Sequence, residues 1–229
     1  MTSPGKQEMK KGFTLIEMLV VVALILLLGG ALYPALLRAK EWGRSTKCLS
    51  NLRQFQVASI HYATDTGHLP RSTDGWYLDF DGWRHTRGWV AWNTWPGFPS
   101  DGPRAGSQHS GGTYSWRGAV GLTCITNGAL WSYVKREKAV YLCPTFEQRT
   151  VCGQTDAVRS YSMNQVLNHR VFADQSMQAS RTVLFGDDGA LLTGVAAANV
   201  DAQFATNEVG RWHGGKGHVI YVDGHTDRW

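Results

Sequence analysis

The chain has 229 residues, of which 43% are hydrophobic, and a formal net charge of +5. This composition supports a buried core and excludes a chain that is disordered throughout. It contains no basic run long enough to predict a nucleic-acid track, so no nucleic-acid partner is expected. The unusual features are ten tryptophans and 26 glycines.

The first forty residues begin with a short polar segment and continue into a long apolar one. Residues 1–12 contain three lysines, and residues 13–37 carry a single charge, Glu17. As a helix, the uncharged stretch 18–37 would span roughly 30 Å, the thickness of the hydrocarbon core of a bilayer. Lysines favour the cytoplasmic side, so the residues beyond this stretch are expected across the membrane.

Composition alone leaves a signal peptide, a plain membrane anchor and a core helix open for this segment. The small residues Gly29, Gly30 and Ala31 would suit a secretory cleavage site. A plain anchor leaves Glu17 unexplained, because a carboxylate inside a spanning helix costs about 2.5–3.5 kcal/mol. The charge therefore predicts a partner or a function.

Residues 11–20 read Lys-Gly-Phe-Thr-Leu-Ile-Glu-Met-Leu-Val and resemble the cleavage and methylation signature of type IV prepilins and of type II secretion pseudopilins. The resemblance implies that the prepilin peptidase cuts after Gly12 and methylates the new terminal amine of Phe13. It also implies that Glu17 pairs with that amine in a neighbouring subunit. Pro34 removes one helical hydrogen bond and matches the proline at which such helices loosen in filaments. A simple kink is the alternative.

Residues 39–66 continue as an amphipathic helix. Residues at spacings of three and four form one face of this helix: Cys48, Leu52, Phe55, Ser59 and Tyr62. Gly67 followed by Pro70 predicts the end of the helix. The expected organisation is a leader (1–12), a membrane or filament-core helix (13–37), its amphipathic continuation (38–66) and a globular head (67–229).

Residues 70–118 hold six of the ten tryptophans among glycines, prolines and aspartates, without a helix or strand period. One interpretation is an aromatic binding surface, for example for a glycan. The composition favours the other, an insertion whose tryptophans form a small core of their own.

Beyond this insertion the pattern predicts a short helix over 127–138. Strands are predicted over four runs separated by turn residues: 139–143, 158–163, 182–186 and 218–222. The fold class is therefore α+β, with the long helix packed on an antiparallel sheet. Asp223-Gly224 predicts a two-residue hairpin within 211–229 that places Ile220 opposite Asp227 and His218 opposite Trp229.

The end of the chain carries a second resemblance. His213, nine residues and then Asp223-Gly224 resemble the H-X9-DG ending of many prepilin-type proteins, and residues 47–54, 142–144 and 160–164 resemble segments of that group. We expect His213 to hydrogen-bond the backbone or carboxylate around Asp223, a structural role preferred over metal ligation.

The four cysteines have no CxxC spacing, which argues against zinc ribbons and thioredoxin-like sites. Disulfides and buried free thiols both remain open. Cys48 and Cys143 lie in the family-like segments, so the hypothesis pairs them and leaves Cys124 with Cys152.

The sequence contains no H-E-x-x-H, G-x-S-x-G or phosphate-loop motif, so no enzyme is expected. The resemblance implies a cofactor-free filament subunit with calcium as the one exception. Major pseudopilins bind calcium near the C-terminal sheet, and the candidates here are Asp187, Asp188 and Asp223.

The expected function is that of a pseudopilin of a type II secretion system. It would be a single-pass protein of the bacterial inner membrane, with its head in the periplasm or on an extracytoplasmic filament. Its partners would be prepilin peptidase, copies of itself and other pilin-like subunits.

The alternatives are a surface type IV pilin and a membrane-anchored envelope protein with a metal-dependent or glycan-binding head. Cys152 is the last cysteine, so the C-terminal disulfide loop common in pilins is lacking, which favours the pseudopilin.

Overall fold

The computed structural model describes residues 13–72, 75–79, 82–86, 88–90, 118–146, 157–167, 178–188, 203–204 and 209–229. The chain divides into two compact units, Met1–Trp42 and Gly43–Trp229.

Helix α1, Leu15–Thr66, is 52 residues long and contains Pro34 in its interior. It ends as predicted at Gly67, which has a φ of +81° and donates its N–H to the carbonyl of Ala63 at 2.8 Å. A residue in the left-handed region just after the last turn satisfies one of the orphan carbonyls of a helix end, and glycine adopts that conformation without a steric penalty.

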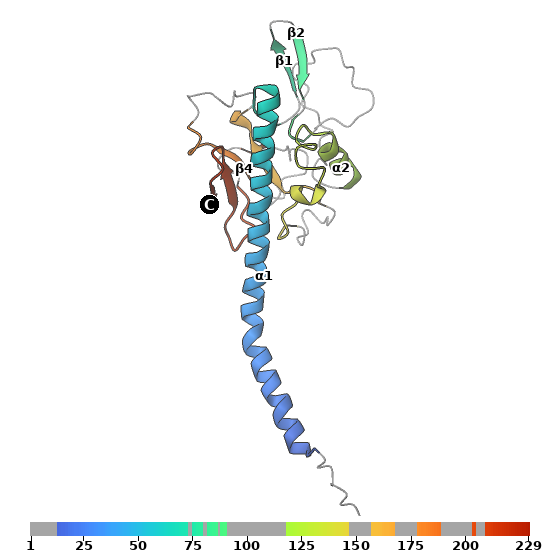
Figure 1. Ribbon diagram of the computed structural model, residues 1–229, viewed down its shortest axis with the longest axis vertical. Helices are drawn as coiled ribbons and strands as arrows, with labels where there is room; N and C mark the ends of the chain where they lie inside the picture. The colour runs from blue at the N-terminus through green and yellow to red at the C-terminus, as the bar shows by residue number, and fades with distance from the viewer. Residues whose placement is uncertain are drawn as a thin grey trace, which may run out of the picture. The chain divides into compact units, whose positions relative to one another are not determined.

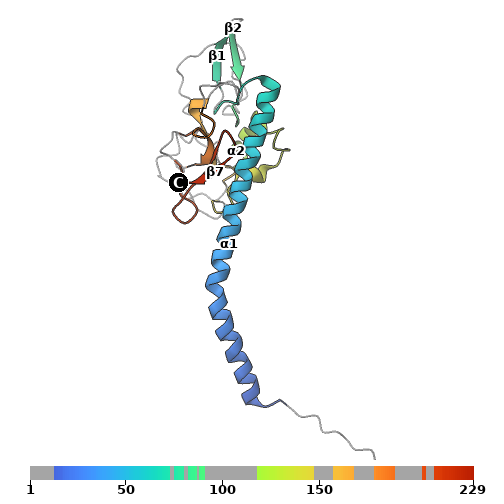
Figure 2. The ribbon, with the colours of Figure 1, turned by 60° about the vertical axis from the view of Figure 1, so that its left-hand side comes forward.

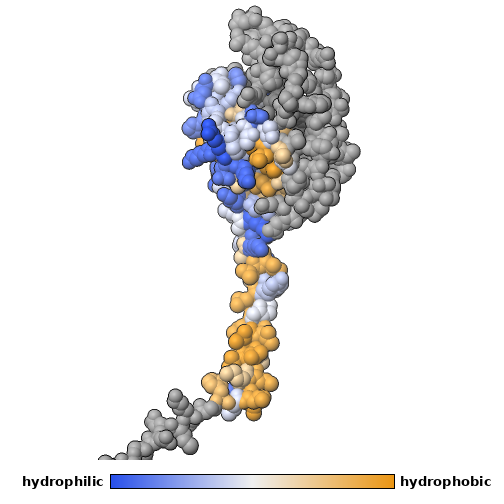
Figure 3. Space-filling view, turned by 90° about the vertical axis from the view of Figure 1, so that its right-hand side faces the viewer, coloured by the Kyte–Doolittle hydropathy of each residue, from blue (hydrophilic) through white to orange (hydrophobic). Residues whose placement is uncertain are grey.

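The part of α1 in the first unit exposes apolar side chains all round. Every residue from 13 to 40 is exposed, and the surface is almost continuously hydrophobic (Figure 3). Within the described part of the chain, α1 is the one helix long and apolar enough to cross a membrane. Apolar surface gains about 25 cal/mol for each Å² removed from water, so this segment requires lipid or other apolar helices around it.

The second unit contains an antiparallel sheet in the order β3-β4-β6-β7. Its strands are β3 (Tyr161–Asn164), β4 (Val183–Asp187), β6 (His218–Tyr221) and β7 (Thr226–Arg228). The two-residue β5 (Gln203–Phe204) pairs parallel to the outer side of β3. The sheet lies beside the later turns of α1 (Figure 1 and Figure 2). The predicted α+β fold, a long helix with a C-terminal antiparallel sheet, is confirmed.

Aromatic side chains form the centre of the core between α1 and the sheet. The ring of Phe55 lies 4.9–5.8 Å from the rings of Trp89, Tyr141, Tyr161 and Phe185. Trp89 is fully buried here, so the interpretation that the insertion tryptophans form a separate core is wrong for this residue. Of the others, Trp92, Trp95 and Trp116 lie outside the described residues, and Trp76 and Trp83 lie on the strands of a hairpin.

That hairpin was not predicted. It consists of β1 (Gly75–Asp79) and β2 (Gly82–Thr86), paired antiparallel with Asp79 opposite Gly82. Glycines and aromatic residues interrupt the alternation of apolar and polar residues that is typical of a strand. For this reason the sequence shows no strand period here.

The predicted helix over 127–138 is also wrong. Helix α2 covers Gly118–Asn127 instead, and turns follow it up to the 3-10 helix η1, Lys138–Tyr141, where a strand was predicted. A Cβ on Gly128 would lie 2.3 Å from the carbonyl oxygen of Trp89, so the chain passes close to another segment where the helix stops. Lys135 and Arg136 then adopt positive φ, which no α-helix allows.

The C-terminal hairpin is present, but its register differs by one residue from the prediction. Ile220 lies opposite Thr226, and His218 lies opposite Arg228. The turn holds three residues, because Tyr221 and His225 close it through a backbone hydrogen bond of 3.0 Å and Gly224 has a φ of +92°. A three-residue loop that ends in a left-handed glycine is the next commonest hairpin connection after the two-residue loop.

Gly224→Ala is therefore expected to destabilise the head. Alanine at this φ costs about 1–2 kcal/mol, and its Cβ would also lie 3.3 Å from the Gln56 side chain. Gly43→Ala is the matched control, because Gly43 is a helical residue with nothing within 4 Å of an added Cβ and alanine gains up to ~1 kcal/mol in a helix. Thermal unfolding followed by circular dichroism should show Tm falling for the first variant and rising for the second. Equal shifts would contradict the turn assignment.

Candidate functional site

The first turn of α1 is closed by a reciprocal cap between Thr14 and Glu17. Thr14 donates its backbone N–H and its hydroxyl to Oε2 of Glu17, at 2.8 and 2.9 Å, and the Glu17 N–H donates to Thr14 Oγ1 at 3.3 Å. This is a capping box, which satisfies backbone donors that have no partner inside the helix. Sequence reasoning missed it, although the Thr-x-x-Glu spacing at 14–17 is its signal.

The cap leaves half of the Glu17 carboxylate available. Both Thr14 bonds go to Oε2, and within the described residues no donor reaches Oε1. The carboxylate is exposed, as is Phe13 beside it. Glu17 can therefore keep its intrahelical bonds and still accept a hydrogen bond or an ion pair from another molecule. Gly12, the predicted cleavage position, lies outside the described residues.

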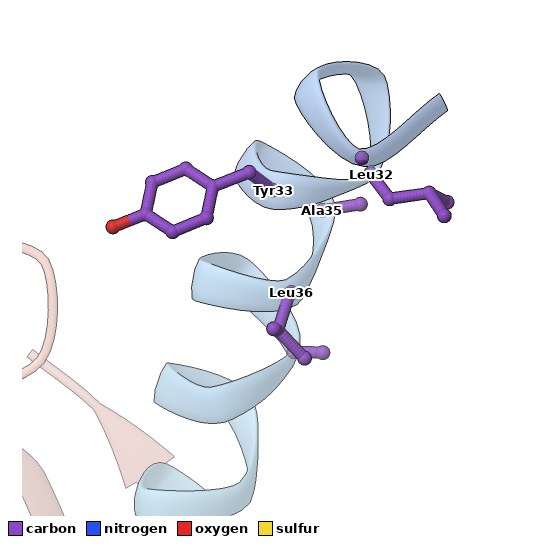
Figure 4. A pocket seen from close by; sticks show the side chains of 6 residues that line it. Leu32, Tyr33, Ala35 and Leu36 are labelled. Atoms are coloured by element: carbon purple, nitrogen blue, oxygen red, sulfur yellow. The ribbon is translucent and has the colours of Figure 1, made fainter. Parts of the chain in front are cut away.

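Around Pro34 the first unit has a shallow apolar hollow. It is lined by Gly29, Leu32, Tyr33, Ala35, Leu36 and Ala39 (Figure 4). No charged side chain lines it, so it suits an acyl chain or an apolar helix better than a polar ligand. The helix is continuous through Pro34; the loosening predicted there concerns the assembled filament and stays a prediction.

In the second unit, the three aspartates predicted to bind calcium have three different sets of partners. Asp188 is buried and pairs with Arg159 at 3.1 Å, and Asp223 pairs at the surface with the ring of His225 at 2.6 Å. Asp187 accepts the N–H of His218 at 2.7 Å. Calcium requires six to eight oxygen ligands around one point. Among the described residues, these three aspartates form no shared group of ligands.

His213 does not take the partner that the sequence suggested. Its Nε2 lies 3.2 Å from Sγ of Cys143, and its Nδ1 lies 3.2 Å from the hydroxyl of Thr145. The Asp223 carboxylate accepts from the backbone and ring of His225 instead. Among the described residues, the expected bond from His213 to the Asp223 carboxylate is not formed, because His225, two positions after Asp223, bonds that carboxylate instead.

The structure brings together the two cysteines that were predicted to pair, but as thiols. Cys48 and Cys143 are free thiols and are buried. Cys124 is buried too, and Cys152 lies outside the described residues. A hydrogen bond from Cys48 lowers the pKa of Cys143 to about 6, with His213 helping and burial opposing. Burial raises the pKa of Cys48 well above its ordinary value. Cys143 is therefore the more acidic of the two thiols.

Residues 9–33 match the family of the prokaryotic N-terminal methylation motif. This motif indicates a type IV pilin-like or pseudopilin precursor, and the long apolar helix is consistent with a membrane anchor. The motif points to a structural pilin-like protein and implies processing by prepilin peptidase. No curated protein and no solved structure is significantly similar to the chain.

Proposed function

We propose that the protein is a structural subunit, a pseudopilin, of a type IV pilus-like filament that serves type II secretion. Prepilin peptidase cuts it after Gly12 and methylates Phe13. The mature subunit is anchored in the inner membrane with its head in the periplasm. It then assembles into the filament with copies of itself and other pilin-like subunits. The function requires no cofactor.

One observation carries the proposal: the methylation motif at 9–33 leads directly into an exposed apolar helix of membrane-crossing length. Such a helix can pass from lipid into a filament core without a large change in its surroundings, because both are apolar. Glu17 is the only charge in this run, and its Oε1 is open to a donor from outside the helix. The Phe13 amine of a neighbouring subunit is a donor of the right charge.

The processing step gives the first test. In cells that contain prepilin peptidase, the mature protein should begin at N-methylated Phe13, which intact-mass and N-terminal peptide mass spectrometry will show. Gly12→Val should leave the precursor uncut, because the scissile position would gain a branched side chain. Gly5→Val, a glycine change elsewhere in the leader, should be cut normally. An N-terminus near Ala31 would instead indicate an ordinary secretory signal and contradict the proposal.

A further inference from the structure

A compact set of ligand atoms lies inside the second unit, apart from the N-terminal motif. One sulfur, one carboxylate oxygen and two imidazole nitrogens, from Cys48, Asp187, His213 and His218, all lie within 4.8 Å of one another. Cys48 comes from α1, Asp187 from the end of β4, and His218 from the start of β6. His213 is 9% exposed and the other three residues are fully buried.

The outer nitrogen of each imidazole is held by a hydroxyl group. His213 Nδ1 shares a hydrogen bond of 3.2 Å with Thr145, and His218 Nε2 shares one of 2.9 Å with Ser45. The inner nitrogens, His213 Nε2 and His218 Nδ1, therefore belong to the cluster. Histidines that bind metals usually hydrogen-bond their second nitrogen in this way, which fixes the tautomer and the ring orientation.

One of these inner nitrogens lacks a hydrogen bond. His218 is fully buried, and its Nδ1 has no hydrogen-bond partner among the described residues. Oδ2 of Asp187 lies 3.5 Å from it. A buried polar atom without a partner is costly, and such an atom in a native protein calls for an explanation. A cation between this nitrogen and the carboxylate would provide its missing partner.

The sulfur ligand is oriented as well. Tyr161 donates its hydroxyl to Sγ of Cys48 at 3.3 Å, and Asn51 in turn donates to that hydroxyl at 3.3 Å. A donor aimed at the sulfur stabilises the thiolate, which is the form that binds metals. The second thiol, Cys143, lies beside His213 and is not needed to complete a set of four ligands.

We propose that Cys48, Asp187, His213 and His218 bind a divalent transition metal ion of the zinc class in a closed structural site. Sulfur and imidazole ligands suit zinc, whereas calcium and magnesium take oxygen ligands. Four protein ligands in a buried place leave no position for a substrate, which is typical of structural zinc sites. The ion would join α1 to β4 and β6, and this inference does not depend on the filament function.

The test is a titration of the full-length, detergent-solubilised protein with Co²⁺ after the thiols are reduced and metals are removed with a chelator. The wild type should bind one ion per chain and show the visible bands of tetrahedral Co²⁺ with a thiolate charge-transfer band in the near ultraviolet. Zn²⁺ should displace the cobalt.

Cys48→Ser should remove the charge-transfer band, and His218→Gln should weaken binding by more than about a hundredfold, beyond the loss typical of outer-shell changes. His225→Gln is the matched control and should bind as the wild type does, because that ring contacts Asp223 and stacks on Tyr221.

Two further measurements separate loss of the site from loss of the fold. Thr145→Val removes the hydroxyl that bonds Nδ1 of His213 and should weaken metal binding about 10–100-fold with an unchanged circular dichroism spectrum. Zn²⁺ should raise Tm of the wild type and of His225→Gln but not of His218→Gln. The proposal is overturned if the reduced wild type binds no cobalt, or if folded Cys48→Ser and His218→Gln retain the wild-type spectrum. A Cys48–Cys143 disulfide in the native protein, together with no metal uptake after reduction, would overturn it too.

Discussion

Glu17→Gln is expected to reduce incorporation of the subunit into filaments by at least about a hundredfold while leaving membrane insertion intact. In the proposed filament, Glu17 and the Phe13 amine of a neighbour form a buried ion pair. Removing one partner from such a pair costs about 3–5 kcal/mol, and each ~1.4 kcal/mol is a factor of ten. Glutamine preserves the capping box, in which either Glu or Gln closes the first turn. The variant thus removes the charge and keeps the helix start. Incorporation can be measured by immunoblotting of sheared filaments against the membrane fraction.

Thr14→Val is the matched control for this prediction. It removes the hydroxyl that bonds Glu17 Oε2 and the Glu17 N–H, at a cost of about 0.5–2 kcal/mol to the helix start. It leaves the carboxylate charged, so filaments should still form. Normal assembly of Glu17→Gln combined with failed assembly of Thr14→Val would mean that Glu17 serves only as a cap.

Asp188→Ala is expected to lower the free energy of unfolding by about 3–5 kcal/mol, because it removes the carboxylate that pairs with the buried guanidinium of Arg159. Both side chains are almost wholly buried, at 0% and 1% exposure. Arg159 also donates to the carbonyl of Tyr161 and lies over the ring of Trp89, so it cannot turn out to water without disrupting the core. Denaturant unfolding of the reduced protein provides the measurement.

Two variants sharpen this result. The double change Arg159→Met with Asp188→Leu should be far more stable than Asp188→Ala, since replacing a whole buried pair with apolar residues is often neutral. Asp223→Ala removes a contact with His225 at the surface, where solvent weakens the attraction, and should lose much less stability. Similar losses for Asp188→Ala and Asp223→Ala would contradict the role assigned to the buried pair.

The parts of the fold that local patterns determine could be predicted from the sequence. The apolar run and the repeat through Cys48, Leu52 and Phe55 gave helix α1, and Gly67 gave its end. Strands β4 and β6 followed from their β-branched and apolar residues. The turn at Asp223-Gly224 was found, but its register was not, because the same dipeptide fits loops of two and of three residues.

Features that depend on distant contacts could not be predicted. Trp89 lies in a stretch without periodicity, and only its packing against Phe55 and Tyr141 places it in the core. The metal-ligand cluster is a stronger case, since Cys48 and Asp187 are 139 positions apart and meet only through the sheet. The Thr14–Glu17 cap is different, because it is a local contact and its Thr-x-x-Glu spacing can be read directly from the sequence.

The edge strand β7 limits how the sheets of neighbouring heads can pair. Strand β7 has only three residues, and Asp227 and Arg228 on it are exposed. A long, flat, apolar edge would invite the sheet of another molecule to join it, whereas short and charged edges resist such joining. Heads held at high local concentration along a filament would therefore stay separate folding units at this edge. Subunits of the proposed filament would then be able to dissociate again, because their heads would not be joined in a cross-β sheet, which is extremely stable.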